Sequence, residues 1–129
     1  MQANANGRAF AWHEANVPDA AKAVKFYTEV VGWTTQSMPM GGDMGEYTMF
    51  CAEGTPVCGL MPTVGDMANV PPHWSVYIRV DDVDSAVSKA QAAGGKVVVP
   101  AFEVPTVGRM SLLQDDQGAH FWVFKAAPA

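Results

Sequence analysis

The stretch Trp12-His13-Glu14-Ala15-Asn16-Val17-Pro18-Asp19, continued through Phe26-Tyr27 to Gly32-Trp33, organises this chain of 129 residues. Residues 12–17 read as a short strand that carries polar and aromatic side chains. Asp19 is a suitable N-cap, and an apolar stripe at helical spacing follows it. Gly32 then ends the predicted helix as a C′ residue. One face of this helix must therefore pack on a sheet.

The same order of elements returns in the second half of the chain. Residues 80–87 align without gaps over residues 17–24, and the same offset places Gly95 over Gly32. Twice that offset nearly fills the chain, so the repeat is the architecture. The sequence predicts an α+β fold of two βαβββ modules. Two mixed sheets, each with its helix on one face, can curl their other faces around a shared cleft.

The glycines and prolines between the apolar segments set the expected limits of the domain and its strands. We expect a polar tail over residues 1–9 and a single domain over 10–125, made of a module at about 10–62, a connector at 63–72 and a module at about 73–125. The second helix should follow Asp81-Asp82 and run to Ala93. The strands after the first are expected at 33–38, 46–52, 55–62, 73–80, 96–99, 109–114 and 120–125.

Composition excludes several classes of function. A net charge of −5 without a basic cluster argues against nucleic-acid binding. No apolar run is long enough to span a bilayer, and the N-terminus lacks the pattern of a signal peptide, so we expect a cytoplasmic protein with no membrane partner. Cys51 and Cys58 flank a predicted turn and could face each other across a hairpin. The simpler interpretation is two buried, reduced thiols.

This βαβββ–βαβββ order resembles the vicinal oxygen chelate superfamily, which includes glyoxalase I, extradiol dioxygenases and the fosfomycin- and bleomycin-resistance proteins. The resemblance covers roughly residues 10–125. A subgroup of glyoxalase-like proteins is similar in narrower motifs. Those motifs are Trp12-x-Glu14, Phe26-Tyr27 with Gly32-Trp33, Val107-Gly108-Arg109, Asp115-Asp116-Gln117-Gly118 and Phe124-Lys125.

Metal-dependent members of that superfamily place ligands on the first and last strands of each module. The resemblance carries these positions onto Trp12, Ser75 and Trp122, and onto the region of Gly59 or Met61. None of these residues is a histidine or a carboxylate. The resemblance therefore implies that the usual metal site is absent, and we predict no cofactor.

Alternation along the first strand directs attention to Glu14. Trp12, Glu14 and Asn16 share one face, whereas His13 shares the face that the helix covers and is expected to be a core or interface residue. A carboxylate on the cleft face is a candidate general base, or an acceptor for a cationic or hydrogen-bond-donating ligand. The alternative is a structural carboxylate bonded to Arg79, Arg109 or backbone donors.

A displaced metal site is the competing interpretation of the histidines. Glu14, His73 and His120 would form a His-His-carboxylate set suited to a divalent metal. Both histidines lie at strand starts, however, where exposed residues are ordinary.

The remaining candidates are aromatic or soft side chains expected to bind a flat, partly apolar ligand. Several of them could instead fill the core, and Arg109, a candidate clamp for an anionic group, could be an ordinary surface arginine. The expected ligand-binding residues are Trp12, Tyr47, Met49, Ser75, Tyr77, Arg109, Trp122 and Phe124.

Three functions follow from these observations. The first is a metal-independent protein that binds a small molecule in an aromatic cleft, in the manner of bleomycin-resistance proteins. The second is a metal-dependent lyase or dioxygenase that uses the displaced set. The third is a metal-free enzyme with Glu14 as its base. Open sheet edges and the resemblance also predict a homodimer.

Overall fold

The computed structural model describes residues 8–39, 45–63 and 69–128. The chain divides into two compact units, which we call the first unit (residues 13–74) and the second unit (residues 1–12 and 75–129). Residues 10–12 thus belong with the second unit, although the repeat assigned them to the first module. The domain limits drawn from the repeat stay a prediction.

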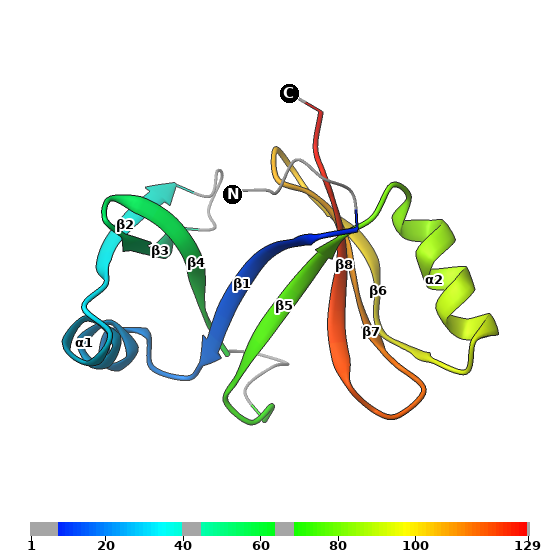
Figure 1. Ribbon diagram of the computed structural model, residues 1–129, viewed down its shortest axis with the longest axis horizontal. Helices are drawn as coiled ribbons and strands as arrows, with labels where there is room; N and C mark the ends of the chain where they lie inside the picture. Colours follow the sequence, from blue (N-terminus) through cyan, green and yellow to red (C-terminus); the bar gives the residue numbers. More distant parts are fainter. Residues whose placement is uncertain (1–7, 40–44, 64–68, 129) are drawn as a thin grey trace. The chain divides into compact units, whose positions relative to one another are not determined.

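The first unit contains one helix and a mixed sheet (Figure 1). Its elements are β1 (Phe10–Val17, of which residues 13–17 lie in this unit), α1 (Ala20–Val30), β2 (Thr34–Pro39), β3 (Glu46–Ala52) and β4 (Thr55–Pro62). The strands lie in the order β2-β3-β4-β1. β1 pairs in parallel with β4, and the β2–β3 and β3–β4 pairs are antiparallel.

The second unit repeats this plan. Its elements are β5 (His73–Arg79, of which residues 75–79 lie in this unit), α2 (Val83–Ala92), β6 (Lys96–Val104), β7 (Gly108–Gln114) and β8 (His120–Ala126). The strands lie in the order β5-β8-β7-β6, with β5 and β8 parallel and the other pairs antiparallel. The predicted α+β class and the strand–helix–three-strand order of each half are confirmed.

The residues that begin and end the helices are those that the sequence predicts. Asp19 caps α1 by accepting the backbone N–H of Lys22 at 3.1 Å, and Asp82 caps α2 by accepting that of Ser85 at 3.0 Å. Gly32 follows α1 with a φ of +85°, a left-handed conformation that glycine adopts without a steric penalty.

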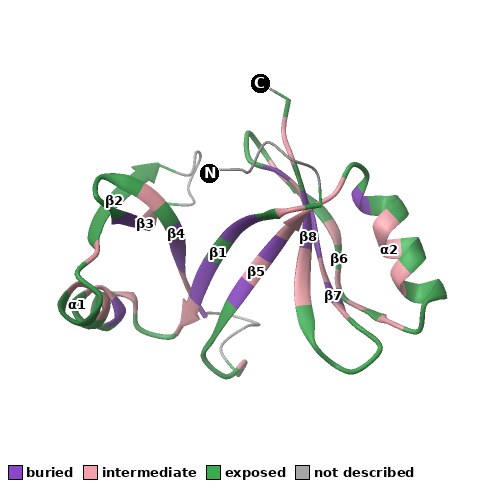
Figure 2. Ribbon diagram, in the orientation of Figure 1, coloured by how far each residue is buried: buried purple, intermediate pink, exposed green. Residues whose placement is uncertain are grey.

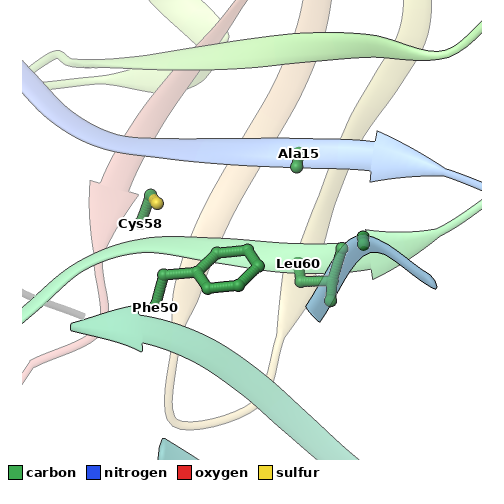
Figure 3. Packing of buried hydrophobic residues seen from close by; sticks show 5 residues of the cluster. Ala15, Phe50, Cys58 and Leu60 are labelled. Carbon is green, nitrogen blue, oxygen red and sulfur yellow. The ribbon is translucent and has the colours of Figure 1, made fainter. Parts of the chain in front are cut away.

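The core of the first unit lies between its sheet and α1. Figure 3 shows Ala15, Phe50, Cys58 and Leu60, which come from three neighbouring strands, and Ala23 of α1 packs against them. Ala15 faces the helix, as alternation along β1 predicts. His13 shares that parity but is exposed, so of the two expected roles the core one is wrong and the interface one stays a prediction. The partly buried residues around this core are Val17, Ala20, Val24, Tyr27 and Trp33. His13 is not among them.

The core of the second unit lies under α2. Val83, Leu113 and Val123 are its fully buried members, and Val87 and Val97 are among the side chains that pack around them. Figure 2 shows α2 mostly exposed or intermediate, with a buried segment at its start, where Val83 is the buried residue. Alternation then places Trp122 and Phe124 on the opposite face of β8 from Val123.

One strand is much longer than predicted. β6 was expected to end at Val99, but it continues through Pro100 to Val104. Its pairing with β7 shifts register between Val97 and Val99 and again between Val99 and Phe102. Proline is tolerated there because β6 is the outer strand of its half-sheet and the irregular register needs fewer backbone donors.

Both cysteines are buried and free. Burial and the neighbouring Cys51 raise the pKa of Cys58 to about 11, so its thiol stays protonated at neutral pH. Among the residues that the structure describes, no helix is long and apolar enough to cross a membrane.

Candidate functional site

Glu14 is a buried carboxylate in the first unit, with 7% of its surface exposed. Its Oε2 accepts a hydrogen bond from the hydroxyl of Tyr47 at 2.8 Å, and its Oε1 accepts one from the side-chain amide of Asn16 at 3.2 Å. Both carboxylate oxygens therefore have a donor from a neighbouring side chain. We call Glu14, Asn16 and Tyr47 the Glu14 cluster.

The register of the sheet explains why these residues meet. Glu14 on β1 lies opposite Gly59 on β4, and Gly59 lies opposite Met49 on β3. Tyr47 is two residues from Met49 and shares its face of β3. Gly59 contributes no side chain between Glu14 and Met49. The face lies opposite the one that α1 covers.

The second unit carries an aromatic cluster on the face away from α2. Tyr77 on β5 is paired with Trp122 on β8, and their rings stack with centroids 5.4 Å apart at an angle of 13°. Phe124 meets Tyr77 edge to face at 6.4 Å, and Phe102 meets Trp122 in the same way at 6.1 Å. We call Tyr77, Phe102, Trp122 and Phe124 the aromatic face.

Phe102 did not emerge from the sequence. It lies beyond Pro100 on β6, where the register shifts defeat a simple count of alternation. Its pairing with Met110, which in turn lies opposite Phe124, brings it to the aromatic face. The only available signal was an aromatic residue in a segment where the sequence predicts no strand.

Two further candidates are buried members of the second unit. Trp12 has 2% of its surface exposed and Ser75 has 8%. Ser75 precedes Tyr77 by two residues on β5 and therefore shares its face. Met49 and Tyr77 are also buried, whereas Trp122 is half-buried. Of the aromatic candidates on β5 and β8, Trp122 is thus the one that is not fully buried.

Arg109 is not brought together with the aromatic face. Its guanidinium binds Asp84 at the start of α2 with contacts of 2.7 and 3.2 Å, and lies 3.5 Å from Glu103. The hydrogen bonds from Arg109 hold the pKa of Asp84 below its usual range. Two carboxylates therefore already neutralise the side chain that we expected to clamp an anion.

The histidines of the displaced metal set are exposed. The Nδ1 of His73 donates to the backbone carbonyl of Pro71 at 2.7 Å. His120 belongs to the second unit, whereas Glu14 and His73 belong to the first. Within residues 8–39, 45–63 and 69–128, no three His, Cys, Asp or Glu side chains gather as a metal requires.

The superfamily positions for a metal do not fit one either. Trp12, Ser75 and Trp122 offer one hydroxyl and two indoles, and an indole nitrogen is a donor that does not bind a divalent cation. The arrangement can instead supply a buried carboxylate beside a phenol in one unit and a stacking surface in the other.

A protein-family model described as the Glyoxalase/Bleomycin resistance protein/Dioxygenase superfamily matches residues 9–123. Two curated relatives are similar over 89% of this chain. "Putative glyoxylase CFP32" of Mycobacterium bovis is 38% identical and "Anthracycline biosynthesis protein DnrV" of Streptomyces peucetius is 32% identical. The chain covers 44% and 46% of their lengths, so it spans about half of each.

A solved structure supports the fold. The crystal structure of methylmalonyl-CoA epimerase from Mycobacterium tuberculosis matches with a TM-score of 0.64 at 17% identity. The match covers 97% of this chain and 93% of the epimerase chain. At this level of identity the likeness concerns the fold alone.

Proposed function

This chain belongs to the Glyoxalase/Bleomycin resistance protein/Dioxygenase superfamily, and from that premise we propose that it binds a small, flat organic molecule on its aromatic face. The observation that carries the proposal is the stack of Tyr77 on Trp122, whose rings are 5.4 Å apart and nearly parallel. Tyr77 is buried, while Trp122 is only partly buried.

Such a pair is suited to extend its stack by one more ring. Aromatic rings prefer offset stacked or edge-to-face neighbours, and Phe102 and Phe124 make edge contacts with the pair. A preorganised surface loses little side-chain entropy when a ligand binds. One relative is named for glyoxylase activity and another for anthracycline biosynthesis, and both names are consistent with small organic ligands.

Replacement of Trp122 by alanine tests this proposal. The probe is 2-naphthamide, a neutral flat aromatic, and its affinity is measured by isothermal titration calorimetry. We expect Trp122→Ala to weaken binding about tenfold, which corresponds to roughly 1.4 kcal/mol of lost stacking. The matched control is Trp74→Ala, because Trp74 is also part-exposed (43%) but packs on Tyr27 and Trp33 in the first unit. Equal losses in the two variants, or none, would contradict the proposal.

A second candidate function is a metal-free reaction in which Glu14 acts as general base. The specific observation in its favour is a carboxylate with only 7% of its surface exposed and with the Tyr47 hydroxyl 2.8 Å from one oxygen. A buried carboxylate can remove a proton from a substrate carbon and hold that proton on its own oxygen. In this function the donors of the Glu14 cluster keep the carboxylate oriented.

We also propose that the protein is a homodimer and is located in the cytoplasm. The curated relatives are about twice as long as this chain, which leaves room for a second copy of the same fold. Light scattering on the purified protein should give twice the chain mass of 13.8 kDa. A mass equal to one chain at micromolar concentration would count against the dimer.

A further inference from the structure

Arg79 lies at the end of β5 on the same side as the aromatic face. It follows Tyr77 by two residues, and alternation places both side chains on one face of the strand. In the parallel pairing of β5 and β8 it lies opposite Phe124. The next positions in this row across the sheet are Met110 and Phe102. Arg79 is therefore the charged end of a row that is otherwise apolar.

The side chain of Arg79 lacks the partners that the other two arginines have. Its Nε is buried and has no hydrogen-bond partner in the part of the chain that the structure describes. Over the same residues the ion pairs of the arginines are those of Arg8 with Asp81 and of Arg109 with Asp84 and Glu103. The residue as a whole is half-buried, so it also has surface that a ligand can reach.

A guanidinium whose buried N–H has no acceptor costs free energy. Arginine stays protonated at every physiological pH, so the group cannot escape the cost by losing its charge. The buried N–H loses its hydration and receives nothing in exchange. The Arg79 backbone does not share this deficit, since its N–H donates to Ala9 and its carbonyl accepts from Arg8. The deficit belongs to the side chain alone.

We propose that Arg79 binds a carboxylate carried by the flat ligand of the aromatic face. A carboxylate accepts two parallel N–H bonds from a guanidinium, and low-polarity neighbours such as Phe124 strengthen such a contact. One arginine balances one negative charge. A phosphate dianion would need a second cation, and in the second unit the guanidinium of Arg109 is engaged by Asp84 and Glu103. This inference rests on the proposed function, because the ring of the same ligand must stack on Trp122.

The test compares two probes that share one ring. Calorimetry is run with 2-naphthoate, which carries the carboxylate, and with 2-naphthamide, which is neutral. We expect the unaltered protein to bind 2-naphthoate at least tenfold more tightly. Arg79→Met should abolish this preference and leave 2-naphthamide binding within about twofold. Arg79→Lys, which keeps the charge but loses the two-pronged geometry, should retain part of the preference.

A matched control removes the same charge elsewhere in the unit. Lys89→Met alters an exposed lysine of α2, on the far side of the sheet from the aromatic face, and should keep the full preference. Circular dichroism is used to check that each variant folds. If Arg79→Met does not fold, Arg79→Lys serves as the test.

The outcomes separate the two proposals. If 2-naphthamide binds through Trp122 but 2-naphthoate binds no better, or if Arg79→Met and Lys89→Met reduce the preference equally, the role of Arg79 is rejected and the aromatic site stands. If neither probe binds, or if Trp122→Ala has no effect on either, the aromatic site is rejected and the role of Arg79 with it.

Discussion

Gly108→Ala is expected to lower the free energy of unfolding by about 2 to 5 kcal/mol, because the change adds a steric overlap to an unfavourable backbone conformation. Gly108 begins β7 with a φ of +153°. A Cβ at this position would overlap the carbonyl oxygen of Lys125 and would lie 2.8 Å from Cε1 of Phe124. Neither the backbone of β8 nor a buried phenylalanine can move aside cheaply. Chemical unfolding followed by tryptophan fluorescence measures the loss.

Two other glycines separate the effect of the backbone conformation from the effect of the steric overlap. Gly54 has a φ of +81°, and a Cβ added there would have no heavy atom within 4 Å. Gly54→Ala should therefore cost about 1 to 2 kcal/mol from backbone strain alone. At Gly95 a Cβ would lie 2.6 Å from the carbonyl oxygen of Gln114 without the unusual φ, so Gly95→Ala isolates the overlap. A Gly108→Ala variant no less stable than Gly54→Ala would show that β7 and β8 do not approach this closely.

This close approach also bears on the aromatic face. Gly108 leaves space that the ring of Phe124 occupies, and Phe124 in turn contacts Tyr77 edge to face. From the sequence, the Val107-Gly108-Arg109 motif was noted only as part of a family resemblance. The structure gives a physical reason for the glycine in the middle of this motif. A side chain there would displace the ring that fixes one side of the Tyr77–Trp122 stack.

The features that the sequence predicts well depend on short stretches of chain. Asp19, Asp82 and Gly32 begin or end a helix that lies next to them in the sequence. Their roles can therefore be predicted without a structure. Alternation gave the face of Ala15, and the repeat gave the order of all ten helices and strands in residues 8–39, 45–63 and 69–128. Each of these inferences needs only the local period or an internal comparison.

The features that the sequence does not reveal depend on which distant residues meet. Arg109 looked like a free cation because Asp84, its partner, is 25 residues away in the chain and on a helix. Arg79 looked like a partner for Glu14, whereas donors from Asn16 and Tyr47 reach that carboxylate. Alternation assigns a side chain to a face, but pairing across strands decides whether a charge on that face is satisfied.

Glu14→Gln is expected to reduce turnover by about 100- to 10,000-fold if the chain catalyses proton abstraction, since this is the usual contribution of a general base. The amide keeps the size of the carboxylate, and its oxygen can still accept from the Tyr47 hydroxyl, but it cannot take up a proton at neutral pH. The assay follows the hemithioacetal of methylglyoxal and a thiol, a substrate with an acidic C–H beside a carbonyl. It is chosen because a relative carries the name glyoxylase.

Binding must be measured on the same variant, because loss of the fold would mimic loss of the base. Affinity for 2-naphthamide should stay within about twofold in Glu14→Gln, since the ring stacks on Trp122 and the removed charge is not its partner. Tyr47→Phe serves as the graded control. It leaves the base in place but removes the donor 2.8 Å from Oε2, so turnover should fall by less than in Glu14→Gln. Turnover unchanged in Glu14→Gln, or absent from the unaltered protein, would reject Glu14 as a base and leave binding as the function of the chain.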